Sequence, residues 1–213
     1  MILDDETARI TASVLLQINA IKLKPENPFT WASGWQSPIY CDNRILLSYP
    51  EHRKFVAEAL AHQTEALYGT PDLIVGVATG AIGVGLLTAE ILGVPFAYVR
   101  PKPKEHGRQN QIEGRAEAGQ RTVVIEDLIS TGMSSLRAID ALRAADLDVR
   151  GMLGIFTYGF DKSVQAFKDA NLQVHTLSNY DHLIAMAESR GYIKSEQLRT
   201  LRDWRTSPQT WKP

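Results

Sequence analysis

Short apolar runs alternate with helical segments along most of the chain, and this alternation restricts the fold more than any other feature. The apolar runs cover residues 73–77, 95–99, 121–126, 152–158 and 172–177. Helical patterns follow them at residues 85–93, 133–145 and 161–170. Continuous apolar runs are typical of strands that are buried on both faces. We therefore predict an α/β fold with a central, mostly parallel sheet flanked by helices.

The two ends of the chain differ from this pattern. We expect helices over residues 4–20, 48–68 and 179–205, the second starting with capping-box spacing between Ser48 and Glu51, and a loose tail after residue 205. Residues 22–50 show little periodicity. We predict one domain over residues 1–213, with a core at about 70–178 and a small N-terminal hood at about 20–48, to which the C-terminal part contributes.

Composition and charge exclude several classes of protein. The net charge of the 213 residues is -1, which argues against a nucleic-acid or polybasic membrane binder. A single cysteine, Cys41, rules out an intrachain disulfide and fits a reducing, cytoplasmic location. The acidic N-terminus is unlike a signal peptide, and the sequence has no apolar run of about 20 residues that would span a bilayer.

The stretch VVIEDLISTGMSS, residues 123–135, carries the strongest chemical signal. The pattern indicates a buried strand that is followed by an acid pair. Small and hydroxylated residues come next and begin a helix. A helix N-terminus with hydroxyl groups and a glycine attracts phosphate, whereas Glu126 and Asp127 repel it and suit sugar hydroxyls or a metal. The pattern therefore predicts a ribose 5-phosphate site, although a strand-end acid pair can also simply cap a helix.

Two further segments would lie at the same edge of the sheet. The glycine-rich turn at residues 76–85 lacks the dinucleotide fingerprint but could bind a second anion. The loop at residues 100–114 gathers five basic side chains, and loops of that length are often functional. The ordinary alternative for the glycine-rich segment is a tight packing turn, and that for the basic segment is a solvated loop.

The aromatic segment at residues 29–44 suggests a pocket for a flat ring or ordinary packing. We interpret His52, His62, His175 and His182 as structural, and Cys41 has no evident base partner that would make it a nucleophile.

Taken together, these motifs resemble those of the orotate phosphoribosyltransferase family within the type I phosphoribosyltransferases. VVIEDLISTG is similar to the signature for phosphoribosyl diphosphate (PRPP), RPKPKEHG with NQIEG is similar to the family's mobile active-site loop, and ASGWQSPIYCDNR resembles its orotate-side segment. The resemblance implies the type I fold and transfer of ribose 5-phosphate from PRPP to orotate, giving orotidine 5′-monophosphate and pyrophosphate in pyrimidine biosynthesis.

The resemblance also implies roles for individual residues. Glu126 and Asp127 would hold the ribose hydroxyls, and Ser130 and Tyr40 would contact orotate. The implied catalytic residues are Arg100, Lys104, His106 and Asp127. The implied PRPP contacts are Arg100, Lys104, His106, Thr79, Gly80, Glu126, Asp127, Leu128, Ile129, Ser130, Thr131, Gly132, Met133 and Ser134. Mg²⁺ would bind through PRPP without a direct protein ligand.

A homodimer is implied as well, with the loop at residues 100–114 reaching the neighbouring subunit's site. Three positions depart from patterns that some members show. Arg100 is followed by Pro101, so Lys102 is the candidate substitute for a second adjacent base. Ala32 stands where some members have lysine, and Thr157 and Tyr158 stand where some have arginine. These departures affect the orotate contacts more than the PRPP contacts.

Two other functions stay open. A purine-type phosphoribosyltransferase would share residues 123–134, although KEHG and NQIEG are not expected in it. A non-enzymatic, PRPP-sensing regulator that binds nucleic acid would need a basic face, for which the net charge of -1 gives little support.

Overall fold

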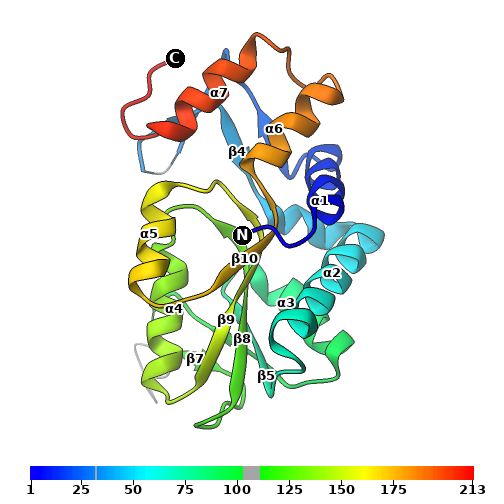
Figure 1. Cartoon of the computed structure of the whole chain (residues 1–213), viewed down its shortest axis with the longest axis vertical. Helices are drawn as coiled ribbons and strands as arrows, with labels where there is room; N and C mark the ends of the chain where they lie inside the picture. Colours follow the sequence, from blue (N-terminus) through cyan, green and yellow to red (C-terminus); the bar gives the residue numbers. More distant parts are fainter. Residues whose placement is uncertain (32, 103–110) are drawn as a thin grey trace.

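The computed structural model describes residues 1–31, 33–102 and 111–213 (Figure 1). Within these residues, the main sheet has six strands in the order β10-β9-β8-β5-β6-β7. All pairs are parallel except the antiparallel pair of β6 and β7. This confirms the predicted mostly parallel sheet. The strands are β5 (Leu73–Val77), β6 (Phe96–Val99), β7 (Ile112–Glu113), β8 (Arg121–Ile129), β9 (Asp148–Thr157) and β10 (Val174–Asn179).

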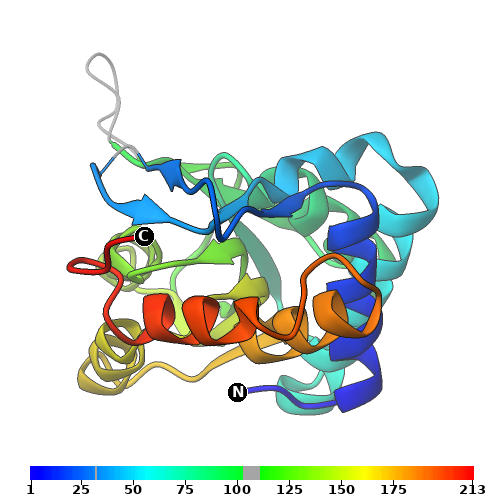
Figure 2. The ribbon, with the colours of Figure 1, turned by 90° about the horizontal axis from the view of Figure 1, so that it is seen from above.

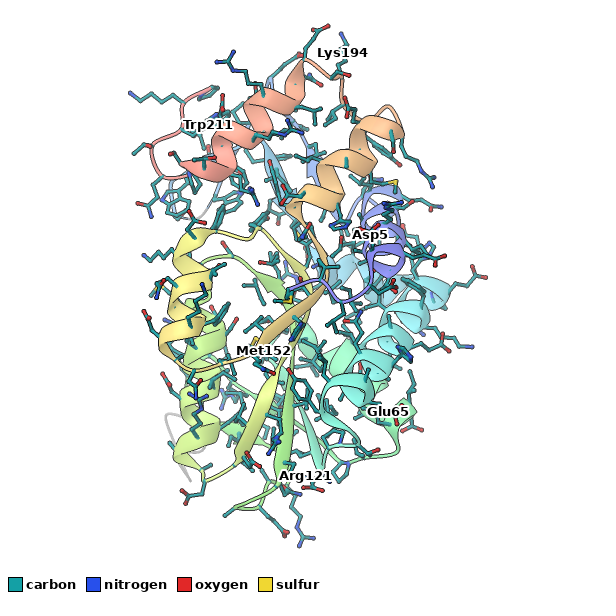
Figure 3. All side chains as sticks on the ribbon, in the orientation of Figure 1. Asp5, Glu65, Arg121, Met152, Lys194 and Trp211 are labelled. Carbon is teal, nitrogen blue, oxygen red and sulfur yellow. The ribbon has the colours of Figure 1, made fainter. Side chains whose placement is uncertain are left out.

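Helices cover both faces of the sheet. Successive side chains of a strand point to opposite faces, and in the central strands both sets are apolar. Val123 and Ile125 of β8 belong to the core cluster under α1, α2 and α3, whereas Val124 belongs to the cluster under α4 and α5. Side chains fill both interlayer spaces (Figure 3). The helices are α1 (Asp5–Gln17), α2 (Pro50–Tyr68), α3 (Ala81–Leu92), α4 (Met133–Ala144) and α5 (Asp161–Asp169).

The carboxyl ends of the parallel strands lie beneath a hood made from both ends of the chain. Figure 3 shows Arg121, the first residue of β8, at the end of the sheet away from α7. Figure 2 looks down on the hood, where α6 and α7 cross this end. The hood elements are β1 (Ile21–Leu23), β2 (Phe29–Thr30), β3 (Gln36–Ser37), β4 (Ile39–Cys41), η1 (Asn43–Ser48), α6 (Tyr180–Ser189) and α7 (Gln197–Thr206).

Specific contacts join the two parts of the hood. Strand β1 pairs with β4 and β2 pairs with β3, both antiparallel. The indole nitrogen of Trp204 in α7 donates to the backbone oxygen of Gln36 at 3.1 Å, and the Trp31 and Trp204 rings are 5.6 Å apart. The irregular segment expected before residue 50 is thus ordered by a helix that lies about 170 positions later in the chain.

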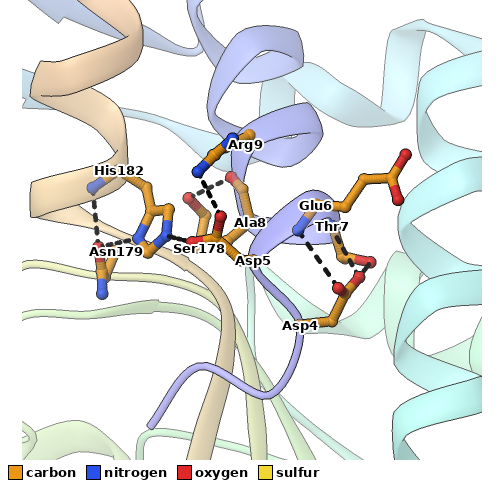
Figure 4. Close-up of polar contacts among 9 residues, drawn as sticks. All are labelled: Asp4, Asp5, Glu6, Thr7, Ala8, Arg9, Ser178, Asn179 and His182. Carbon is orange, nitrogen blue, oxygen red and sulfur yellow. Dashed lines mark hydrogen bonds and ion pairs between the residues drawn. The ribbon is translucent and has the colours of Figure 1, made fainter.

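Polar contacts attach the first helix to the last strand and to α6 (Figure 4). The side chain of Asp4 caps α1. The carboxylate of Asp5 lies 2.7 Å from Nε2 of His182, and the Ser178 hydroxyl donates to the Ala8 oxygen at 2.8 Å. His182 thus takes part in an interhelical contact, which agrees with its interpretation as structural.

Three details of the predicted elements are wrong. Helix α2 begins at Pro50 with Tyr49 as an uncapped N-terminal residue, because Ser48 ends the preceding 3₁₀ helix and cannot form the expected capping box. The C-terminal helix is two helices, α6 and α7. The tail is not loose, since Trp211 packs against the larger core cluster. Among the described residues, no helix is both long and apolar enough to cross a membrane.

Candidate functional site

The strand order changes direction between β5 and β8, and this creates a crevice at the carboxyl end of the sheet. The connection after β5 leads through α3 to β6 on one side, and the connection after β8 leads through α4 to β9 on the other. Ligands of open α/β sheets bind at such a switch point. Residues 78–80 and 130–134, which belong to the two predicted anion-binding segments at 76–85 and 123–135, follow these two strands.

The turn after β8 has the backbone geometry of an anion cradle. Gly132 is the N-cap of α4 with φ 77°, a left-handed conformation that favours glycine. A Cβ at this position would lie 2.8 Å from the Phe167 ring. Thr131 is half-buried, while Met133 and Ser134 are exposed. The first amides of a helix have no acceptor within the helix, which suits the start of α4 to the predicted phosphate role.

The two acids lie near the carboxyl end of β8, in different surroundings. Glu126 is only 4% exposed, and its carboxylate accepts a hydrogen bond of 2.8 Å from the Ser135 hydroxyl and one of 3.2 Å from the Asp127 amide. Burial and the neighbouring Asp127 charge raise the pKa of Glu126 well above its usual range. Asp127 is half-buried, and burial raises its pKa as well.

The carboxylate of Asp127 rests directly on the turn after β5. A Cβ added to Gly80 would lie 2.6 Å from Oδ1 of Asp127 and nearer still to Oδ2, so only glycine leaves room for this side chain. Gly80 has φ -65° and ψ -34°, which any residue adopts, so the backbone itself does not require glycine. Thr79 beside it is exposed, and the peptide bond between Ala78 and Thr79 is cis.

Arg100 stands at the end of β6, on the far side of β5. Its guanidinium lies 3.6 Å from the Glu113 carboxylate, and it borders a cavity of about 60 Å³ together with Ser134 and Arg137. The structure therefore brings Arg100 close to the turn that begins α4. Lys104 and His106 lie outside the described residues.

A second cavity, of about 240 Å³, lies between the hood and the end of β8. Tyr40 and Ser130, the two predicted orotate contacts, both line it. The remaining lining residues are Thr30, Trp31, Cys41, Leu128 and Tyr158. The cavity has aromatic walls and a few polar groups, which suits a flat heterocyclic ring. Ala32, which stands where some members of the family have lysine, lies outside the described residues.

Not every residue of the predicted signature can contact a ligand through its side chain. Ile129 is 1% exposed and packs in the core, and its backbone oxygen accepts from the Tyr158 amide at 3.1 Å. Burial raises the pKa of the Cys41 thiol well above its ordinary value, in line with the expectation that Cys41 is no nucleophile.

The sequence analysis assigned no ligand contact to three residues at the site. The Asn43 side chain donates to the Asp127 backbone oxygen at 2.7 Å and accepts from the Cys41 thiol, so it links the hood to the acid pair. Arg137 comes from the second turn of α4, and Tyr158 comes from the end of β9. Asn43 lies in the segment ASGWQSPIYCDNR and Tyr158 at a position of departure from the family pattern, but only tertiary packing shows what they contact, and Arg137 lies in no motif.

The described residues hold no group of three or more His, Cys, Asp or Glu side chains that could bind a metal ion. Glu126 and Asp127 supply two carboxylates at the crevice. Both carboxylates already make contacts within the protein, and Mg²⁺ prefers six oxygen ligands. A Mg²⁺ ion at this site therefore fits as a companion of a phosphorylated ligand, with most of its oxygen ligands coming from that ligand and from water.

Comparisons with known proteins agree with the geometry. A family model described as a phosphoribosyl transferase domain matches residues 46–156. An orotate phosphoribosyltransferase of Cytophaga hutchinsonii is 52% identical over 93% of this chain and 95% of the relative, and one of Listeria innocua is 48% identical over 94% and 96%. The crystal structure of the Aeropyrum pernix orotate phosphoribosyltransferase superposes with a TM-score of 0.73 at 27% identity, covering 86% of this chain and 99% of that one.

Proposed function

The chain belongs to the orotate phosphoribosyltransferases, and from this premise we propose how its residues perform the reaction. The activity is that of a pentosyltransferase in pyrimidine biosynthesis. Ribose 5-phosphate passes from PRPP to a ring nitrogen of orotate, and orotidine 5′-monophosphate and pyrophosphate are the products.

The contact between Asp127 and Gly80 is the single observation that carries our assignment of roles. It connects the turn after β8 with the turn after β5 through a carboxylate that lies between them. A ribose with phosphate groups at both ends needs this order of groups, with an anion site on each side of a hydroxyl-binding acid. We assign Glu126 and Asp127 to the ribose hydroxyls.

The two phosphate ends then have separate binding elements. The backbone of residues 128–134, with the hydroxyls of Ser130, Thr131 and Ser134, holds the 5′-phosphate at the start of α4. Thr79 and Gly80 hold the pyrophosphate from the sheet side. Arg100, Lys104 and His106 close over the pyrophosphate from the loop, and the position of Arg100 at the end of β6 supports this assignment.

Charge explains how such a site accelerates the reaction. As the bond between the ribose carbon and pyrophosphate breaks, positive charge develops on the sugar ring and negative charge leaves with pyrophosphate. The carboxylates beside the ring stabilise the first, and the basic side chains of the loop stabilise the second. No covalent nucleophile is needed, so positioning of the two reactants provides the remaining acceleration.

Mg²⁺ belongs to the proposal as a partner of the substrate. When bound to PRPP, it neutralises pyrophosphate charge and thereby favours departure of the leaving group. Among the described residues, Glu126 and Asp127 are the carboxylates that would lie nearest to such an ion. We claim no direct protein ligand.

We further propose that residues of about 20–48, with α6 and α7, act as a hood that holds orotate over the core formed by about residues 70–178. The cavity of about 240 Å³ between them supports this division, since Tyr40 from the hood and Ser130 from the core both line it. A homodimer in which the loop at residues 100–114 reaches the neighbouring site, and a cytoplasmic location, stay predictions.

A direct assay tests the proposal. Protein, PRPP, Mg²⁺ and orotate are mixed, and the loss of orotate absorbance is followed, with Asp127→Asn as the inactive counterpart. We expect turnover with the natural chain and a large loss with the variant. Turnover of adenine, guanine or hypoxanthine but not orotate would favour the purine-type alternative. Salt-dependent nucleic-acid binding without turnover would favour the regulator.

A further inference from the structure

Ser135 is a hydroxylated side chain on the apolar face of α4. The buried residues of this helix recur at the spacing of one helical face, and they are Ser135, Ala138, Ile139 and Leu142. The other three are apolar, whereas Ser135 is 2% exposed and carries a hydroxyl whose burial is costly unless it is hydrogen-bonded. Packing alone would favour an apolar side chain at this position, so the hydroxyl calls for another explanation.

The hydroxyl of Ser135 bonds across to the acid pair. It donates to Oε2 of Glu126 at 2.8 Å, nine positions earlier in the chain. Ser163 gives the comparison, because it is the third residue of α5, as Ser135 is of α4, and is equally buried. Its hydroxyl donates to the backbone oxygen of Phe160, the N-cap of α5, at 2.7 Å. A serine at this helix position can thus bond locally, whereas Ser135 reaches the neighbouring strand.

Glu126 is held at both of its carboxylate oxygens. Oε2 accepts from Ser135, and Oε1 accepts from the Asp127 amide at 3.2 Å. An ionised carboxylate offers about four acceptor positions, so room remains for the hydroxyls of a ligand. Burial raises the pKa of Glu126, and the bond from Ser135 acts against this by favouring the ionised form. Without Ser135, the orientation of this flexible side chain would depend on its contacts with Asp127, of which the amide bond is the longer of the two bonds described.

We propose that Ser135 is a positioning residue for the transfer reaction, whose hydroxyl holds the Glu126 carboxylate in the orientation that binds the ribose hydroxyls. The inference rests on the proposed function and extends it to a residue that acts through Glu126. Ser135 lies in the first turn of α4, so the helix that binds the 5′-phosphate also orients the acid beside the ribose. The phosphate and sugar sites are thereby joined in one element.

Ser135→Ala tests the inference, with Ser163→Ala as the matched control. Both variants remove one buried, hydrogen-bonded hydroxyl from the third residue of a helix, so both should lower the melting temperature. For Ser135→Ala, we expect kcat/KM for PRPP to fall about tenfold or more and the KM for orotate to stay within about twofold, because a misplaced carboxylate affects the sugar. For Ser163→Ala, we expect both quantities to stay within about twofold of the natural values.

The Glu126→Ala background gives a readout that a purely structural role would not move. If Ser135 acts through Glu126, adding Ser135→Ala to this background should weaken PRPP binding by no more than about twofold, as measured by calorimetry. An equal loss of PRPP affinity with and without Glu126 would overturn the inference.

Two kinetic results would also overturn it. One is a kcat/KM for PRPP in Ser135→Ala within about threefold of the natural value, and the other is an equal effect of Ser163→Ala. If Ser135→Ala does not fold, Ser135→Cys, which keeps the size of the side chain and weakens the donor, must show the same split between the two substrates. Failure of the natural chain to turn over orotate would instead refute the proposed function, so the two failures are distinguishable.

Discussion

Gly80→Ala is the perturbation whose effect follows most directly from the structure. The helical backbone at Gly80 accepts alanine without strain, so the new methyl group acts on its neighbours alone. Its Cβ would lie 2.6 Å from Oδ1 of Asp127 and nearer still to Oδ2, whereas ordinary Cβ contacts begin at 3.4 Å, so the carboxylate must retreat by more than 0.8 Å. A displacement of roughly 1 Å in a reacting group can cost about 100-fold in rate.

We therefore expect Gly80→Ala to lower kcat/KM for PRPP about 100-fold. Its free energy of unfolding should fall by no more than about 1–3 kcal/mol, the usual cost of overpacking. Steady-state kinetics and urea denaturation measure the two quantities. Gly83→Ala is the control in the same helix, because its Cβ would meet the flexible end of Leu47 and no carboxylate. A Gly80→Ala enzyme with kcat/KM within about threefold of the natural one would refute the reasoning.

Three more substitutions probe the acid pair, the loop and the link to the hood. Because the raised pKa of Glu126 makes its ionised form costly, stability from this group is present below its unfolded pKa and is lost as the pH rises through the folded value. Glu126→Gln should therefore raise the melting temperature at neutral pH, with a gain that vanishes in acid, while turnover falls. Lys104→Ala should lower kcat by about 100- to 1,000-fold, or 2.7–4 kcal/mol, with an unchanged circular dichroism spectrum. Asn43→Ala removes the bond to the Asp127 oxygen and should cost about 1–3 kcal/mol in urea denaturation and raise the KM for PRPP.

Each of these has a result that contradicts it. A pH-independent change in melting temperature for Glu126→Gln would mean that the carboxylate pair is not under electrostatic strain. Near-normal turnover in Lys104→Ala would remove the loop from the mechanism, with exposed Lys54 on α2 as the control site. An Asn43→Ala protein as stable as the natural chain would show that the hood and the acid pair are energetically independent.

The sequence was sufficient for the parts of the fold that depend on local pattern. Apolar runs such as residues 73–77 became strands at the predicted positions, and α4 begins at Met133 as expected. The acid pair was correctly placed at the carboxyl end of the sheet. However, β8 continues past Glu126 to Ile129, because pairing of Leu128 with Phe156 and of Ile129 with Thr157 extends the strand. Pairing between strands is a tertiary effect that a single run does not reveal.

The parts that could not be predicted depend on contacts between distant segments. Asn43 reaches Asp127 across 84 positions, and Trp204 reaches Gln36 across 168. Tyr158 reaches the base cavity because its ring packs among Trp31, Phe160 and Trp204, which lie far apart in the sequence. The roles of the predicted site residues, including Lys104 and His106 outside the described part of the chain, stay predictions for experiment.

A crystal structure of the protein with PRPP and Mg²⁺ measures the central claim most directly. Our account predicts the sugar in the crevice between β5 and β8, both carboxylates of Glu126 and Asp127 within hydrogen-bonding distance of the ribose hydroxyls, and the 5′-phosphate on the amides that begin α4. Phosphate groups bound elsewhere, or carboxylates turned away from a sugar that is present, would contradict it.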